Sequence, residues 1–296
     1  MKMKRYRSFL IVLAFFVCLA APQAGHAAEK HFLWRATSNT ATVYILGSVH
    51  FMKKDAYPLA RVIEDAFDAS EVLAVEADIG KVTPGTFQML RRAGFYGPDD
   101  SLVNHVSVQT YAYATEEGSR LGLPAGALNR QKPWFLGITM ASLELMRLGY
   151  DPNYGIDRHF LNRSAGGKRI VELESLEYQI GLLAGLPDGE QEIFLLYTVK
   201  DLKSTGEQID ALMAAWGAGD AARVASILTK AIENDDTFKT VYKKIMTDRN
   251  GNMTRKISAY LKSGGKVFVV VGAGHLVGDE GIIELLRKEG YKVDQL

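Results

Sequence analysis

Cysteine is almost absent from the sequence, which has a single one, Cys18, in an apolar stretch near the N-terminus. If that stretch is removed as a leader, no thiol remains in the mature chain. This excludes disulfides, a cysteine nucleophile and cysteine metal ligands. A lipoprotein signal needs a small residue before its cysteine, and Val17 does not fit that requirement.

A long hydrophobic run is also missing. The N-terminus reads as a basic "MKMKRYRS", an apolar "FLIVLAFFVCLAA" and a small-residue "PQAGHA", which is typical of a secretory signal peptide. Its apolar run is shorter than the roughly 20 residues that a transmembrane helix requires; an uncleaved anchor is the alternative. We expect residues 1–27 to be a leader cleaved after Ala27, with Ala28 as the near alternative. The mature chain, residues 28–296, would then be periplasmic or secreted, with no integral membrane segment.

An excess of charge of one sign is absent as well. The 35 Lys and Arg residues nearly balance the 34 Asp and Glu residues, and Lys2, Lys4, Arg5 and Arg7 leave with the leader. The mature chain is therefore slightly acidic and has no basic stripe, which argues against a nucleic-acid partner. No tandem repeat, low-complexity segment or Pro/Ser-rich linker divides it. With 47% hydrophobic residues, one domain with a substantial core is expected.

Several catalytic motifs are missing. The sequence contains no G-x-S-x-G and no H-E-x-x-H, which excludes a serine-hydrolase elbow and a thermolysin-like zinc helix. Gly272, Gly274 and Gly278 follow a strand in the manner of a dinucleotide-binding loop. However, the chain ends too soon after Gly278 for the second βαβ unit that such a site needs.

Hydrophobic patterning predicts an α/β fold of the mixed α+β kind: a central mixed β-sheet covered by helices, with long helical insertions in the middle of the chain. The longest apolar run, in "KVFVVVGAGH", predicts a strand buried on both faces. Helical patterns fill most of 84–166 and 176–264, with a helix at Ala60–Ala69 and another that stops at Gly290. Strands are expected at Phe32–Arg35, Ala41–Leu46, Glu71–Val75, Arg169–Leu173, Lys266–Val271 and Tyr291–Leu296.

Two of these strands end in the same pattern, G-x-x-H. One runs into Gly47 and His50, and the other into Gly272, Gly274 and His275. A lone histidine after a strand is more often structural, whereas two copies in matching context point to a shared site. The glycines would let a tight turn carry each histidine out of the plane of its strand.

Two other strands end in carboxylates, Glu76 and Glu174. Open α/β sheets bind ligands at the carboxyl ends of their strands, so these side chains could meet both histidines in one crevice. Two histidines and a carboxylate suffice for an open divalent metal site, and a second carboxylate could act as general base. The alternatives are metal-free chemistry with histidine as the base, and glutamates in solvated turns.

A polar pair, Arg249 and Asn250, interrupts a helix that otherwise has an apolar face. Such a pair is usually a solvated face, but the arginine could instead clamp an anionic group or a catalytic carboxylate. "YGIDRHF" is a similar polar insert, in which His159 is expected to be structural.

Seven blocks follow in the order seen in the TraB/GumN family, which the chain resembles from about Leu33 to Val293. They are "YILGSVHF", "EVLAVEAD", "KPWF", "YGIDRHFL", "VELESLEYQIGLL", "DRNGNMTRKI" and "FVVVGAGHLVGDEGIIELLRKEGYKV". The family is related to the Tiki proteases, which are described as metal-dependent, and to erythromycin esterases and ChaN-like haem-binding proteins.

The resemblance implies that Gly47, His50, Gly272 and His275 are the family's two G-x-x-H motifs. It also implies that Glu76 and Glu174 are its acidic positions and that Arg249-Asn250 is its "RN" pair. Ser48 stands where the family usually has Thr, a change that keeps the hydroxyl.

The resulting expectation is a metal-dependent, peptidase-like hydrolase. His50, Glu76 and His275 would hold Mn²⁺ or a similar divalent ion, Glu174 would act as base or orient another group, and Arg249 with Asn250 would position the substrate or an oxyanion. Two alternatives stay open: a protein that binds a peptide or small molecule without turnover, and a metal-independent esterase.

Overall fold

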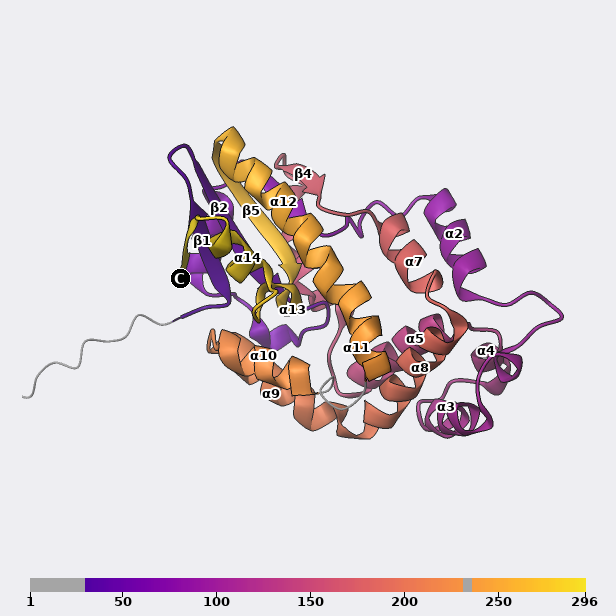
Figure 1. Cartoon of the computed structure of the whole chain (residues 1–296). Helices are drawn as coiled ribbons and strands as arrows, with labels where there is room; N and C mark the ends of the chain where they lie inside the picture. The colour runs from indigo at the N-terminus through magenta and orange to yellow at the C-terminus, as the bar shows by residue number, and fades with distance from the viewer. Residues whose placement is uncertain (1–29, 231–235) are drawn as a thin grey trace, which may run out of the picture.

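The computed structural model describes residues 30–230 and 236–296, so the expected leader lies outside the described residues. Within them, six strands form one mixed sheet in the order β4-β3-β5-β2-β1-β6 (Figure 1). The strands are β1 (Leu33–Thr37), β2 (Ala41–Ser48), β3 (Val72–Val75), β4 (Arg169–Glu172), β5 (Gly265–Gly272) and β6 (Lys292–Gln295).

Strands β2, β5, β3 and β4 are parallel to one another, whereas β1 is antiparallel to both β2 and β6. Because the four parallel strands are neighbours, their carboxyl ends share one edge of the sheet. The register pairs Ser48 with Gly272 and Val75 with both Val270 and Glu172. Residues that follow these strand ends are therefore close in space although distant in sequence.

Strand β5 is the centre of the core. Its residues from Val267 to Val271 are all buried, as the uninterrupted apolar run predicted, because helices cover both faces of the sheet. Phe268 packs against Phe67 of α1 and Phe160 of α6, with ring centroids 5.5 and 4.9 Å apart. The long helix α12 lies across the sheet (Figure 1).

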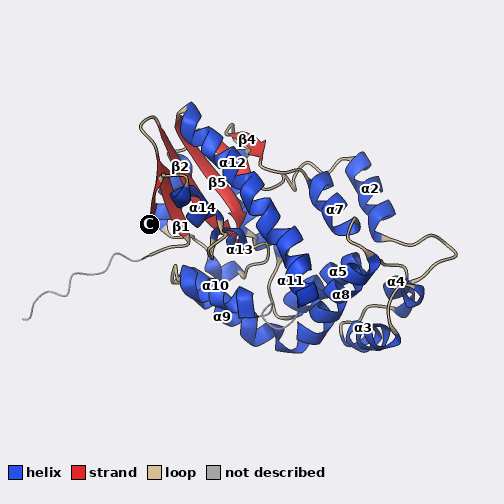
Figure 2. Cartoon of the chain, in the orientation of Figure 1, coloured by secondary structure: helices blue, strands red, loops and turns tan. Residues whose placement is uncertain are grey.

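The helices fall in four of the connections between strands (Figure 2). Apart from α1, which joins β2 to β3, they lie between β3 and β4, between β4 and β5, and after β5. Their bounds are α1 (Arg61–Asp68), α2 (Pro84–Gly94), α3 (Val108–Arg120), α4 (Ala125–Asn129), α5 (Pro133–Arg147), α6 (Ile156–Ser164), α7 (Leu176–Ala184), α8 (Asp188–Asp201), α9 (Thr205–Gly217), α10 (Ala221–Lys230), α11 (Asp236–Tyr242), α12 (Asp248–Ser263), α13 (Ala273–Leu276) and α14 (Ile282–Lys288).

The predicted mixed α/β fold with long helical insertions is confirmed, and the predicted ends of its elements shift by one or two residues. Strand β2 continues through Gly47 and Ser48 because both pair with β5. Gly290 ends α14 in the left-handed region, at φ 90°, as its pattern predicted.

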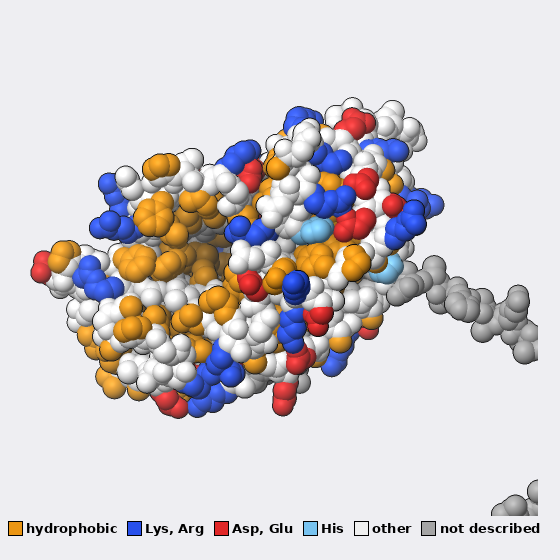
Figure 3. Space-filling model, turned by 180° about the vertical axis from the view of Figure 1, so that it is seen from behind, with side chains coloured by type: hydrophobic (Ala, Val, Ile, Leu, Met, Phe, Trp, Pro, Cys, Tyr) orange, Lys and Arg blue, Asp and Glu red, His pale blue; other side chains and the backbone are white. Residues whose placement is uncertain are grey.

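The helical insertions have an apolar cluster of their own, separate from the cluster around the sheet. Leu136 and Met140 of α5 meet Leu195 and Val199 of α8, and each is at most 2% exposed. Seen from behind, this half of the molecule is hollowed, and apolar side chains line the hollow (Figure 3). Among the described residues, no helix combines the length and the apolar character needed to cross a bilayer.

Candidate functional site

His50 lies two residues beyond the end of β2 and is held by α6. Its Nδ1 is 2.7 Å from Oδ2 of Asp157, whose Oδ1 accepts a hydrogen bond of 3.0 Å from the Ser48 hydroxyl. Asp157 is itself buried, with 6% exposed. Because Nδ1 is engaged, Nε2 is the ring nitrogen of His50 that is available for chemistry.

The start of α6 packs unusually closely on the backbone at His50. The N–H of Ile156 donates to the carbonyl of Val49 at 3.0 Å. A Cβ on Gly155 would lie 2.4 Å from the carbonyl oxygen of His50, so only glycine permits this approach. The first turn of α6 thereby brings Asp157 against the imidazole.

His275 lies in the short helix α13, directly after β5, and is 4% exposed. Its Nδ1 is 2.6 Å from Oδ1 of Asn250, while Nδ2 of Asn250 donates to the carbonyl of Glu280 at 2.8 Å. A carbonyl only accepts, so the amide nitrogen of Asn250 must face Glu280 and its oxygen must face His275. Nδ1 of His275 therefore carries the proton, and the Nε2 lone pair is free.

Glu76 follows β3 and lies between the other groups. Its Oε1 accepts the backbone N–H of Gly272 and is 3.8 Å from Nε2 of His275. Its Oε2 accepts from Nη2 of Arg249 at 2.9 Å. The carboxylate is 7% exposed, so it depends on these donors to remain charged.

Arg249 joins the two glutamates. Its Nε lies 3.0 and 3.1 Å from the oxygens of Glu174, and its Nη2 lies 2.7 Å from Oε2 of Glu174. Gln179 donates to both carboxylates, at 3.3 Å to Glu76 and 3.1 Å to Glu174. The arginine side chain is only 11% exposed, so the alternative of a solvated face is wrong for this residue.

The helix that carries Arg249 and Asn250 is preceded by a turn of π-helix, Lys243–Thr247. Nη1 of Arg249 donates to the carbonyl of Ile245, four residues earlier, at 3.0 Å. Wider helical turns of this kind recur at functional sites because they change the direction of the side chains around them. Here Arg249 and Asn250 are adjacent, yet one contacts the carboxylates and the other contacts His275.

The motif glycines allow close packing. A Cβ on Gly272 would lie 3.1 Å from Oε1 of Glu76, and one on Gly47 would lie 2.3 Å from the ring of Phe32. A Cβ on Gly274 would lie 3.0 Å from Cε of Met246. Each glycine therefore has a neighbour in the place that its own side chain would take.

The two histidines have opposite electrostatic surroundings. The Asp157 carboxylate raises the pKa of His50, whose side chain is 65% exposed, to about 9. Burial lowers the pKa of His275 to about 4. Burial would raise the pKa of Glu76, but the charges of His275, His50 and Arg249 hold it below its usual value. At neutral pH one ring is thus an acid and the other a neutral base.

These groups line a cavity of about 320 Å³. The cavity has a polar wall and an apolar wall, and the apolar wall is formed by Leu182 and Leu183 of α7, Phe194 of α8, and Ile245 with Met246. Glu174 and Asn250 do not line this cavity, and they act on it through Arg249 and His275. The residues that line its polar wall are His50, Glu76, Gln179, Arg249, Gly272, Gly274 and His275.

Two residues of the site, Asp157 and Gln179, were not predicted from the sequence. Asp157 belongs to "YGIDRHF", in which His159 was the residue considered; His159 instead lies 3.3 Å from Glu64. A signal for Asp157 was present, because an acidic residue in the first turn of a helix often accepts a hydrogen bond. Nothing local in the sequence shows that its partner is His50.

The donor types at this site fit a divalent cation. Both rings present Nε2 after Nδ1 has been anchored, which is how proteins orient histidine ligands, and Glu76 supplies an oxygen. His50, whose pKa is raised to about 9, would have to lose its Nε2 proton to bind the ion. The described part of the chain nevertheless has no group of three His, Cys, Asp or Glu side chains arranged to hold an ion. Glu76 would have to loosen its contact with Arg249, which would retain Glu174 as its partner.

Comparison with known proteins finds relatives over most of the chain. The uncharacterized protein YbaP of Escherichia coli (strain K12) is 24% identical over 269 residues, which cover 87% of this chain and 94% of YbaP. An uncharacterized protein of Treponema pallidum (strain Nichols) is 22% identical over 300 residues, covering 94% of this chain and 88% of that protein. No solved structure shows a significant match. The sequence model of the TraB/PrgY/gumN family matches residues 32–295, so the chain belongs to the TraB/PrgY/gumN family.

Proposed function

We propose that this protein is a hydrolase, acting on a peptide in the periplasm or outside the cell, with its centre at His50, Glu76 and His275. One observation carries the proposal. Two histidines, each anchored through Nδ1, face one cavity with a buried carboxylate near His275. Anchoring of this kind leaves Nε2 of both rings for the reacting groups.

In the leading form of the proposal, the site works with a divalent cation such as Mn²⁺. His50, Glu76 and His275 would hold the ion, which would supply an activated water when bound. Arg249 would orient Glu76 and Glu174 and place positive charge beside a developing oxyanion. The apolar wall would hold a side chain of the substrate next to the reacting bond and exclude water from it.

A second form, hydrolysis without metal, is favoured by the opposite protonation of the two histidines. His275 would accept a proton from water at Nε2, and protonated His50 would donate to the leaving group. Pairs of titratable groups whose pKa values are pushed apart are a common basis for acid–base catalysis. An ester is the natural substrate in this form.

The test is hydrolysis of peptide and ester libraries by the purified mature chain, with EDTA, with EDTA followed by Mn²⁺, and without either. Elemental analysis of the same preparation accompanies it. Activity that EDTA abolishes and Mn²⁺ restores supports the metal form. Activity that EDTA does not change and that is lost in His275→Ala supports the metal-free form.

His105→Ala is the matched control. His105 pairs with Asp100 in the helical insertion, away from the cavity, so this variant should keep full activity. Peptides that bind without any product, in wild type and control alike, would show a binding protein and overturn the hydrolase.

A further inference from the structure

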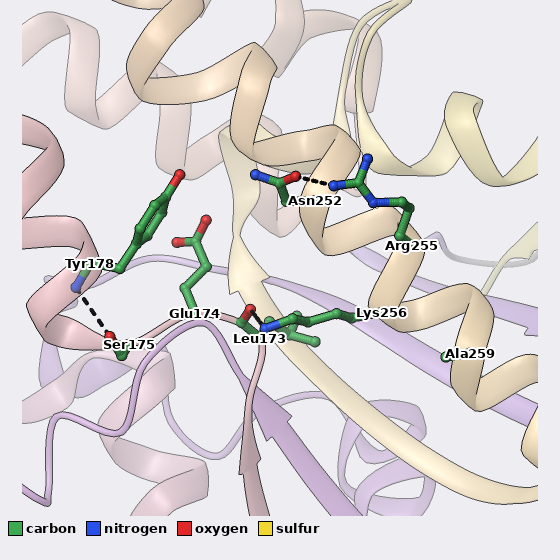
Figure 4. Close-up of a pocket in the computed structure, with 8 residues that line it drawn as sticks. All are labelled: Leu173, Glu174, Ser175, Tyr178, Asn252, Arg255, Lys256 and Ala259. Carbon is green, nitrogen blue, oxygen red and sulfur yellow. Dashed lines mark hydrogen bonds between the residues drawn. The ribbon is translucent and has the colours of Figure 1, made fainter.

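A second groove lies on the other side of Glu174, between the start of α7 and the outer face of α12 (Figure 4). Its volume is about 620 Å³. The pair formed by Glu174 and Arg249 is the wall that this groove shares with the cavity of the two histidines. The polar residues that line it are Glu174, Ser175, Tyr178, Asn252, Arg255 and Lys256.

The groove has two exposed cations without a carboxylate partner among the described residues. The guanidinium of Arg255 donates to the side-chain oxygen of Asn252, and the ammonium of Lys256 donates to the carbonyl of Leu173 (Figure 4). Both partners are neutral. The only carboxylate in the lining, Glu174, is already paired with Arg249, so the groove has a net positive charge.

The spacing of these groups matches an extended chain. Arg249, Asn252 and Lys256 are three and four residues apart on α12, which places them along one face of the helix. Arg255, three residues after Asn252, lies at the edge of that face and is held there by its hydrogen bond to Asn252. From Arg249 to Lys256 the helix rises by about 10 Å. An extended peptide covers that distance in about three residues.

We propose that this groove is the subsite for a carboxylate of the peptide substrate, about three residues from the bond placed in the histidine cavity. Arg255 and Lys256 bind the carboxylate, and Tyr178, which is 43% exposed, flanks it. The carboxylate is either an acidic side chain or the C-terminus of the peptide. This inference rests on the proposed function for its substrate, but its test does not require turnover.

The experiment measures binding of fluorescent peptides to the mature His275→Ala protein by anisotropy. Four peptides share one sequence and differ in two places: Glu or Gln at the third residue from the intended bond, and a free or an amidated C-terminus. A charged contact of this kind should strengthen binding about tenfold. Preference for Glu identifies the side chain as the ligand, and preference for the free terminus identifies the C-terminus.

In the His275→Ala protein, adding Arg255→Ala should remove most of the preference for the peptide with the carboxylate. Adding both Arg255→Ala and Lys256→Ala should remove all of that preference. Arg255→Ala is the safer variant for folding because Arg255 is an exposed residue whose guanidinium hydrogen-bonds to the side chain of Asn252, whereas Lys256 donates to the backbone of Leu173. Lys262→Ala, an exposed cation of the same helix outside the groove, should change nothing.

Equal binding of all four peptides, or a preference that survives the double substitution, overturns the subsite. A preference that depends on Arg255 supports it even if the wild type hydrolyses none of the peptides, in which case only the proposed function fails. If the wild type does hydrolyse them, the double substitution should raise KM for the preferred peptide and leave kcat nearly unchanged.

Discussion

At the scale of single residues, Asn250 selects the tautomer of His275. The buried amide can present its oxygen to the ring only because its nitrogen donates to Glu280. A neutral amide in this place keeps His275 uncharged, whereas a carboxylate would favour the protonated ring. Burial lowers the pKa of His275, and the neutral amide adds no negative charge that would oppose this effect.

Asn250→Asp should raise the pKa of His275 from about 4 by about one unit or more, because a buried carboxylate would then face Nδ1. Titration of the ring by NMR measures this shift. Asn162→Asp, at an exposed position of α6, is the control and should leave His275 unchanged. An unaltered pKa in Asn250→Asp would contradict the role given to the amide.

At the scale of elements, the site depends on how α6 meets the end of β2. Gly155→Ala should push the first turn of α6 away from His50, because the new Cβ would overlap the His50 carbonyl. Asp157 would move with that turn, and the pKa of His50 should fall from about 9 towards 6.5. We expect a loss of about 1–3 kcal/mol in the free energy of unfolding as well.

NMR titration of His50 and unfolding in urea test this expectation. The control is Gly126→Ala in α4, where a Cβ would meet nothing within 4 Å. If Gly155→Ala loses stability while His50 keeps its high pKa, then the glycine matters only for packing.

A second contact between elements joins α3 to α5 in the helical insertion. Glu144 is 1% exposed and lies 2.7 Å from Nη2 of Arg147 and 2.9 Å from Nη1 of Arg120. The hydrogen bond from Arg147 outweighs burial, and with Arg120 it lowers the pKa of Glu144. The pKa of Glu144 is thus lower in the folded state than in the unfolded state. Glu144 therefore contributes its full stabilisation at pH values above the unfolded-state pKa and loses it as the pH falls through the folded-state pKa.

Glu144→Gln should cost about 1–2 kcal/mol of unfolding free energy at pH 7, a modest figure because both arginines reach solvent. Below about pH 4.3, the usual pKa of glutamate, the difference from wild type should shrink, because the wild-type carboxylate loses its advantage as the pH falls through its folded-state pKa. Urea unfolding of wild type and variant at pH 7 and at pH 3 measures the cost of the substitution and its decrease at low pH. Glu284→Gln, in an exposed pair with Arg287, should cost almost nothing at either pH.

At the scale of the whole molecule, the helical insertions contact the sheet at the strand ends that carry the histidine motifs. Trp216 of α9 donates its indole N–H to the carbonyl of Gly47 at 2.7 Å, across 169 residues of sequence. Phe194 of α8 and Leu183 of α7 line the same cavity as the two histidines. The strand ends, together with Gln179 of α7 and Arg249 of α12, supply the polar wall, and the insertions supply the apolar one.

Trp216→Phe should therefore disturb the site as well as the fold, because it removes the donor to Gly47, three residues before His50. Trp134→Phe is a matched control, since Trp134 donates to the carbonyl of Ala93 at 3.1 Å within the insertion. Each substitution should cost about 1–3 kcal/mol in urea unfolding. Only Trp216→Phe should shift the NMR signals of His50, and equal shifts in both variants would argue against a specific attachment.

Local pattern was enough to predict the sheet and the positions of its carboxyl ends. The apolar run of β5 and the two G-x-x-H motifs are read from neighbouring residues, and burial of β5 follows from the same residues. Glu76 and Glu174 were found in this way because each directly follows a strand. Patterns of this kind depend on contacts within a few residues, which the sequence displays directly.

The sequence alone placed His50, Glu76, Glu174 and His275 at the ends of strands. Tertiary structure added Asp157 and Gln179 and decided what each group does. The partner of His50 is 107 residues away, and Arg249 reaches Glu76 across 173 residues. The Asp157 carboxylate makes His50 an acid, and burial makes His275 a base. Charge state depends on every group within a few ångströms, and only the folded chain brings those groups together.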